Sequence, residues 1–232
     1  MVEGSDTGEK PDIAALSDVS NALLFAPSSE REENCLAFLT QSPPTETYVL
    51  VVTYDNTARE WIGWWNANVA ESPALGGIVS VGQTAKEIGA DPGPPGQSPE
   101  TVLDDVWTVT AVEDPADLTG VGIEMSRLLS KLSEAASESE TESEVLSEIS
   151  GEADDGPRIV VCFDSLSALL RHADMERTFR FLHVATGRVR SGDALGYYHL
   201  DPERHDAETL ATLKTLFDAV LDDGDDGWTV ET

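Results

Sequence analysis

The chain has 232 residues, of which 40% are hydrophobic, and this is enough to bury the core of one α/β domain. Its 44 acidic residues outnumber its 14 Lys and Arg residues and give a formal net charge of -30, which disfavours direct nucleic acid binding because no basic patch is available for phosphates. No apolar run reaches the roughly 18 residues of a membrane-spanning helix, and the polar, acidic start does not match a signal peptide, so we expect a cytoplasmic protein.

The first half of the chain alternates continuous apolar runs with helical patterns. Residues 1–17 are polar and acidic, and we expect them to be disordered. The segments that follow predict strands at 22–26, 47–54, 76–82 and 105–112, helices at 30–40 and 56–70, and a Pro/Gly-rich loop at 88–100. Continuous apolar strands that are separated by helices indicate parallel strands buried on both faces.

The second half continues this alternation after a change in composition. A helix is predicted from about residue 115, and the Ser- and Glu-rich stretch 133–157 is either its solvated extension or a flexible insert, of which the composition favours the insert. Strands are then predicted at 158–163, 193–200 and 227–232, and helices at 175–190 and 207–222. The alternation predicts a single α/β domain over residues 18–232, with a three-layer RecA-like fold and a mostly parallel central sheet.

The segment 21–39 has the layout of a phosphate-binding loop, because an apolar strand runs through a short polar loop into an apolar helix. A working loop uses glycines to turn backbone N–H groups toward the phosphates, a lysine to neutralise them, and a Ser or Thr to bind magnesium. Here the loop has no glycine. The positions that correspond to the late glycine, the lysine and the Ser or Thr hold Arg31, Glu32 and Glu33. Carboxylates at these places would oppose a triphosphate.

Two further carboxylates complete a family resemblance. Asp55 follows the second predicted strand, and "IVVCFDSLS" is an apolar strand that ends in Asp164. With segment 21–39, this arrangement resembles the KaiC/RecA-like P-loop ATPases over roughly residues 18–231, and it is similar to haloarchaeal KaiC-like proteins of unknown function that have a degenerate phosphate loop.

The resemblance implies roles for both carboxylates, and each role has a structural alternative. Asp164 takes the position where the family's Asp holds magnesium through water, or it is a strand-end residue that hydrogen-bonds Ser165 or Ser167. Asp55 takes the position of a catalytic Glu that orients the attacking water, or it caps the following helix, with "DNTARE" as a capping turn. The structural alternative is favoured for Asp164 and is at least as good for Asp55.

The loop residues Ser28, Ser29, Glu32 and Glu33 are interpreted as the vestige of a phosphate site. Acidic residues in the first turn of a helix satisfy the helix dipole that a phosphate would otherwise satisfy. We therefore expect no cofactor. The alternative is a protein that binds ATP and magnesium unconventionally, through the helix N-terminus, Ser28 and Ser29, with Asp164 holding the metal.

The four histidines are not spaced along the chain in a way that is typical of metal ligands. They are His172, His183, His199 and His205. His199 and Asp201 end a predicted parallel strand, at the edge where open α/β sheets bind ligands, so "YHLDPERH" is a possible ligand site, although an ordinary polar turn is the better interpretation.

Cysteines and tryptophans complete the candidates. Cys35 and Cys162 are interpreted as small buried residues rather than a disulfide or zinc ligands. Trp61, Trp64 and Trp65 cover more than one face of a predicted helix, so we expect some indole surface to be exposed as a protein contact.

The charge also indicates the solvent. Self-repulsion loosens a compact state less near 1 M salt, where the Debye length is about 3 Å, than at physiological ionic strength, where it is about 8 Å. The abundance of Asp and Glu with little Lys resembles proteins of extremely halophilic archaea. We therefore expect a non-catalytic, pseudo-ATPase domain that acts as a regulatory or protein-interaction module in such a cytoplasm, paired with a protein partner or with itself.

Overall fold

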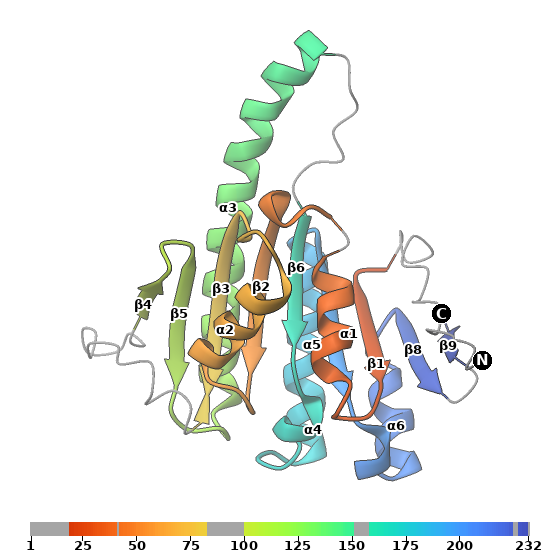
Figure 1. The fold of residues 1–232 in the computed structure, drawn as a ribbon. Helices are drawn as coiled ribbons and strands as arrows, with labels where there is room; N and C mark the ends of the chain where they lie inside the picture. The colour runs from red at the N-terminus through yellow and green to blue at the C-terminus, as the bar shows by residue number, and fades with distance from the viewer. Residues whose placement is uncertain (1–18, 41, 83–99, 151–157, 225–226, 232) are drawn as a thin grey trace, which may run out of the picture.

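Nine strands form one sheet in the computed structural model, and helices lie on both of its faces (Figure 1). The structure describes residues 19–40, 42–82, 100–150, 158–224 and 227–231. The strand order is β4-β5-β3-β2-β6-β7-β1-β8-β9. The strands are β1 (Asn21–Phe25), β2 (Thr47–Thr53), β3 (Leu75–Val81), β4 (Glu100–Leu103), β5 (Trp107–Val112), β6 (Arg158–Phe163), β7 (Ala194–Leu200), β8 (Ala219–Gly224) and β9 (Gly227–Glu231). The helices are α1 (Arg31–Leu39), α2 (Ala58–Asn68), α3 (Leu118–Ser150), α4 (Leu166–Leu169), α5 (Met175–Ser191) and α6 (Ala207–Lys214).

Neighbouring strands are parallel except at the two edges, where β4 and β9 each run antiparallel to the strand beside them. Every residue of β1, β2 and β5 is buried, as expected for parallel strands that are covered on both faces. This confirms the predicted α/β class with a mostly parallel central sheet, and the three-layer arrangement is consistent with a RecA-like fold.

Alternate residues of each strand feed two separate cores, because successive side chains point to opposite faces of a sheet. Leu50 and Val52 of β2 join the core under α3, α4, α5 and α6. Val49 and Val51 join the core under α1 and α2. The sheet is therefore the middle layer, and the helices that follow β1 and β2 lie on the face opposite to those that follow β5, β6 and β7.

The structure differs from the sequence prediction in two segments. The helix predicted at 207–222 ends at Lys214, and residues Ala219–Gly224 form β8 instead, because this short apolar run pairs with β1 and buries Leu221 completely. Strand β4 was not predicted, because its four residues show no clear apolar pattern in the sequence. In the structure only alternate positions of this strand are partly buried.

The Ser- and Glu-rich stretch is helical as far as the structure describes it, which is the alternative that the composition had favoured less. Helix α3 continues to Ser150 and runs past the end of the sheet (Figure 1). Residues 151–157 of the proposed insert, and the N-terminal segment 1–17, lie outside the described residues. Within the described part of the chain, no helix has both the length and the apolar character needed to cross a membrane.

Candidate functional site

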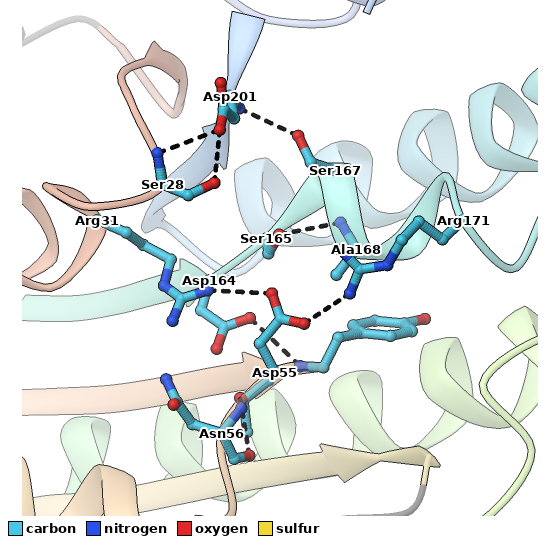
Figure 2. Close-up of polar contacts among 12 residues, drawn as sticks. Ser28, Arg31, Asp55, Asn56, Asp164, Ser165, Ser167, Ala168, Arg171 and Asp201 are labelled. Atoms are coloured by element: carbon cyan, nitrogen blue, oxygen red, sulfur yellow. Dashed lines mark hydrogen bonds and ion pairs between the residues drawn. The ribbon is translucent and has the colours of Figure 1, made fainter. Parts of the chain in front are cut away.

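The carboxyl ends of the four adjacent strands β2, β6, β7 and β1 lie side by side along one border of the sheet, which we call the carboxyl edge. Because these strands are parallel, the residues that follow them lie together there, as Figure 2 shows. The sequence analysis gave this edge, where open α/β sheets bind ligands, as the place of a possible ligand site. The structure brings four predicted site residues to it, namely Ser28, Asp55, Asp164 and Asp201, and adds Arg31 and Arg171.

The loop between β1 and α1 is tied to the end of β7. The backbone N–H and the Oγ of Ser28 both donate to Oδ2 of Asp201, at 3.2 and 2.6 Å. Burial opposes the charge on Asp201, but the hydrogen bonds from Ser28 and Arg204 hold its pKa below the ordinary value. The loop therefore directs this N–H and hydroxyl at a carboxylate of its own chain, not at an open site.

The other loop residues face solvent. Ser29, Glu32 and Glu33 are exposed, and both glutamates lie in the first turn of α1. That position agrees with the predicted interaction between acidic side chains and the helix dipole.

Asp55 is held between two arginines. Its Oδ2 pairs with Arg31 Nη1 at 3.1 Å, and its Oδ1 pairs with Arg171 Nη2 at 2.7 Å. The Arg31 side chain is 14% exposed, so this guanidinium is largely enclosed within the edge. Both carboxylate oxygens of Asp55 are therefore engaged in ion pairs with the chain's own arginines.

The predicted N-cap role of Asp55 is wrong, although the capping turn itself is present. Thr57 is the N-cap of α2, and it forms a capping box with Glu60: Thr57 Oγ1 accepts the Glu60 N–H at 3.1 Å, and Glu60 Oε2 accepts the Thr57 N–H at 2.9 Å. Asp55 lies outside that turn because the ion pairs with Arg31 and Arg171 hold it over the sheet edge.

Asp164 is buried at the end of β6 and is 3% exposed. Its Oδ1 accepts the Tyr54 N–H at 3.3 Å, and its Oδ2 makes no hydrogen bond among the described residues. Burial raises the pKa of Asp164 to about 6, against the influence of Arg31 and of the Thr53 hydroxyl. That hydroxyl lies close enough to favour the anion, but it donates to the Asn56 carbonyl at 3.1 Å.

The predicted bonds from Asp164 to Ser165 or Ser167 are wrong. Ser165 Oγ instead caps α4 by accepting the Ala168 N–H at 2.9 Å, and Ser167 Oγ accepts the Asp201 N–H at 3.1 Å. The Ser165 hydroxyl is thus committed to the start of α4, and the Ser167 hydroxyl to the end of β7.

The residues at this edge do not fit a magnesium ion. No hydroxyl from the loop stands beside Asp164, and the neighbouring charge is the Arg31 guanidinium, which would repel a cation. In the part of the chain that the structure describes, no three His, Cys, Asp or Glu side chains form a metal-binding group. The free Oδ2 of Asp164 alone does not make a site.

His199 is not a surface ligand. It is 1% exposed on β7, and burial lowers its pKa to about 4; Arg31 acts in the same direction, and the backbone of Pro27 and Ala26 opposes it. The imidazole is therefore neutral at pH 7. Asp201, its predicted companion, is committed to Ser28 and Arg204.

His205 occupies the more open position near this strand end, and it is the last residue of the stretch "YHLDPERH" that the sequence analysis gave as a possible ligand site. Its Nε2 lies 2.9 Å from Ser167 Oγ, and both residues line a hollow of about 450 Å³ together with Arg171 and Arg204. His205 lies four residues after Asp201, directly after the short 3-10 turn Pro202–Arg204.

A family model matches residues 19–223, which is most of the chain. The chain belongs to DUF7504, a family of unknown function. No curated protein matches this family member.

Three solved structures resemble the DUF7504 chain at low identity. The uncharacterised protein PH0321 from Pyrococcus horikoshii, in complex with an unknown peptide, is 12% identical with a TM-score of 0.51, over 90% of this chain and 80% of that one. PH0250 from Pyrococcus horikoshii OT3 is 9% identical with a TM-score of 0.45, over 91% and 86%. The cytoplasmic domain of EssC is 14% identical with a TM-score of 0.41, and this chain covers 34% of it. At 12% identity, the likeness to PH0321 shows the fold alone.

The two cysteines of this DUF7504 chain lie in contact. Both are buried, as predicted, but their Sγ atoms are 2.8 Å apart, which the sequence analysis did not foresee. Cys35 belongs to α1 and Cys162 to β6, and these elements pack together on one face of the sheet. A separation of 127 positions gave no signal of pairing.

The tryptophans are mostly internal. Trp61 and Trp65 are buried and pack against each other and against Trp107 of β5, with ring centroids 5.3 to 5.8 Å apart. Trp64 alone of the three helix tryptophans is half-buried. The predicted indole surface is therefore limited to this one ring.

Proposed function

We propose that this chain is a KaiC/RecA-like domain that does not hydrolyse ATP and that acts as a protein-interaction or regulatory module in a halophilic archaeal cytoplasm. The observation that carries the proposal is the ion-pair group Arg31–Asp55–Arg171, which fills the carboxyl edge of the sheet with the chain's own charges.

Each group that would act on a triphosphate is already engaged or has the wrong charge. Ser28 binds Asp201, both oxygens of Asp55 are paired, and Asp164 is a buried carboxyl with a raised pKa. Glu32 and Glu33 place negative charge at the start of α1. Stabilising a phosphoryl-transfer transition state requires preorganised cations and N–H donors directed at the phosphate, and this arrangement opposes that requirement.

A groove between α3 and α5 supports the interaction role. It has a volume of about 590 Å³, and its lining includes Ile123 and Val184, which are 59% and 60% exposed. Arg177, Arg180 and Arg188 flank these apolar side chains. In a chain with a net charge of -30, an apolar groove with three arginines favours an acidic partner surface.

That acidic surface is available on a second copy of the chain, so self-association is the form of interaction that we propose. The similarly folded PH0321 was crystallised with an unknown peptide, which adds support to a protein-binding role for this fold.

The decisive experiment is calorimetric titration of ATP and magnesium into the purified chain in about 2 M KCl, where the Debye length is below about 3 Å and self-repulsion is screened. We expect no binding heat from a protein that circular dichroism shows to be folded.

The competing function is ATP binding through an unconventional loop, for which Arg31 offers a cation. It would be supported, and the proposal overturned, by saturable micromolar binding that is lost in Asp164→Ala. Glu176→Ala is the matched control, because this carboxylate is exposed on α5 and its one ion pair among the described residues is with Arg180 on the same helix.

A further inference from the structure

The contact between Cys35 and Cys162 lies at the base of the candidate site. The Sγ–Sγ distance of 2.8 Å falls between the roughly 2.05 Å of a disulfide bond and the roughly 3.5–4.0 Å of ordinary non-bonded contact. Joining the two sulfurs therefore requires a movement of less than about 1 Å. Both side chains belong to the apolar core under α1 and α2.

A small oxidant has a route to one of the two sulfurs. Cys35 lines a cavity of about 50 Å³ together with Arg31, Asp164 and Trp61. A cavity holds one water when the centre of a water-sized sphere has roughly 10–15 Å³ in it, so this cavity has room for a small reagent such as hydrogen peroxide. Cys162 is completely buried, so it is reached through Cys35.

We propose that Cys35 and Cys162 form a reversible intrachain disulfide, with hydrogen peroxide as the oxidant. This inference is independent of the proposed function, since it holds whether or not the chain binds ATP.

The chemistry runs in two balanced steps. The Cys35 sulfur attacks one peroxide oxygen, the O–O bond breaks, and the products are a sulfenic acid on Cys35 and one water. The Cys162 sulfur then attacks Cys35 Sγ, the S–O bond breaks, and the Cys162 proton leaves with the hydroxyl group as a second water. Two thiols and one peroxide give one disulfide and two waters, so the protein is oxidised by two electrons and the peroxide is reduced.

The second step is the slow one. Burial raises the pKa of Cys162 well above its ordinary value, and the nearby Cys35 and Asp164 act in the same direction. Because the thiolate is the nucleophile, we expect the sulfenic acid on Cys35 to persist long enough to be trapped.

The cross-link would fix the helix that carries Arg31 to the strand that ends in Asp164. Arg31 begins α1 four residues before Cys35, and Asp164 follows Cys162 by two. Oxidation is therefore expected to restrain α1 against β6, together with the Arg31–Asp55 ion pair that is already present with both thiols free.

Mass spectrometry of the full chain tests the proposal directly. The reduced protein is treated with equimolar peroxide in about 2 M KCl, unfolded and alkylated. We expect two alkylated thiols before treatment and none after it, a mass lower by about 2 Da, and a linked peptide pair that contains Cys35 and Cys162. The oxidised form should melt roughly 10 °C higher, because the cross-link closes a long loop in the unfolded chain.

Two variants separate this pairing from other oxidation. Cys162→Ser should stop at a Cys35 sulfenic acid that dimedone traps, and Cys35→Ser should keep Cys162 as a free thiol. The proposal is overturned if both wild-type thiols survive treatment, if Cys35 is oxidised without a link to Cys162, or if the only disulfides join separate chains. These three outcomes are measured on the wild-type protein, so they do not depend on whether the variants fold.

Discussion

At the scale of single residues, the carboxyl edge is organised by one enclosed guanidinium. Arg31 pairs with Asp55, and its charge also acts on the buried Asp164 and His199. It thereby favours a charged Asp164 and a neutral His199. Burial still dominates at Asp164, whose pKa is raised to about 6, so this carboxyl is a cost to the folded state once it ionises.

Asp164 should make stability depend on pH. Its folded-state pKa of about 6 lies above the ordinary 3.8, so the folded state binds the proton more tightly, and stability falls as pH rises from about 4 to about 6. Asp164→Asn removes this cost and should raise the free energy of unfolding by about 2–3 kcal/mol at pH 8 and by about half of that at pH 5. Urea unfolding at the two pH values measures the difference.

The comparison with the wild type at each pH cancels the titration of the other carboxylates. Asp222→Asn, at an exposed position on β8, controls for the loss of one negative charge. A gain for Asp164→Asn that is equal at pH 5 and pH 8 would show that its carboxyl does not titrate in this range.

At the scale of elements, the sequence predicted most of the parallel strands and their helices, because continuous apolar runs are long and unambiguous in the centre of a sheet. Residues 158–163 and 194–200 are examples. The sequence prediction failed at residues 219–224. A short apolar run that follows a helical pattern is typical of a longer helix, and only its pairing with β1 identifies it as a strand. Edge strand β4 was missed because its burial is only partial.

The site was predictable in position but not in its contacts. Asp55, Asp164 and Asp201 each follow an apolar strand, and the parallel arrangement of those strands is enough to predict that the three carboxylates share one edge of the sheet. The choice of partners depends on side chains brought from distant segments. Arg171, which is 116 positions from Asp55, has no sequence signal that links it to that carboxylate.

Strand β8 gives a test at this scale. Leu221 is completely buried between β8 and α1, so Leu221→Ala should lower the free energy of unfolding by about 2–5 kcal/mol. Leu210→Ala on α6 is the matched control, since this leucine is only half-buried and should cost clearly less. Equal losses in urea unfolding would contradict the burial of β8 against β1.

At the scale of the whole molecule, charge is distributed unevenly. The chain carries a net charge of -30, yet Arg177, Arg180 and Arg188 gather along the groove between α3 and α5. The groove also holds two of the exposed large hydrophobic side chains, Ile123 and Val184. This combination suits an interface with an acidic surface, and the groove lies on the helical face formed by α3 and α5.

Val184→Glu should disrupt self-association through this groove. It places a carboxylate among the exposed apolar side chains of the proposed interface, and we expect at least a tenfold loss in dimer affinity, which corresponds to about 1.4 kcal/mol. Light scattering over a range of concentrations in about 2 M KCl measures it. Val102→Glu, at a 57% exposed position on β4, is the control. A wild-type chain that stays monomeric, or an equal effect at Val102, would contradict the interface.

The tryptophan cluster provides an optical consequence of this architecture. Trp61 lines the same cavity as Cys35 and packs against Trp65 and Trp107, so a bond between the two sulfurs would form beside this indole cluster. A disulfide at contact range quenches indole emission. The intrinsic fluorescence of the chain should therefore report, without any added label, whether the helix that begins at Arg31 is covalently attached to the sheet.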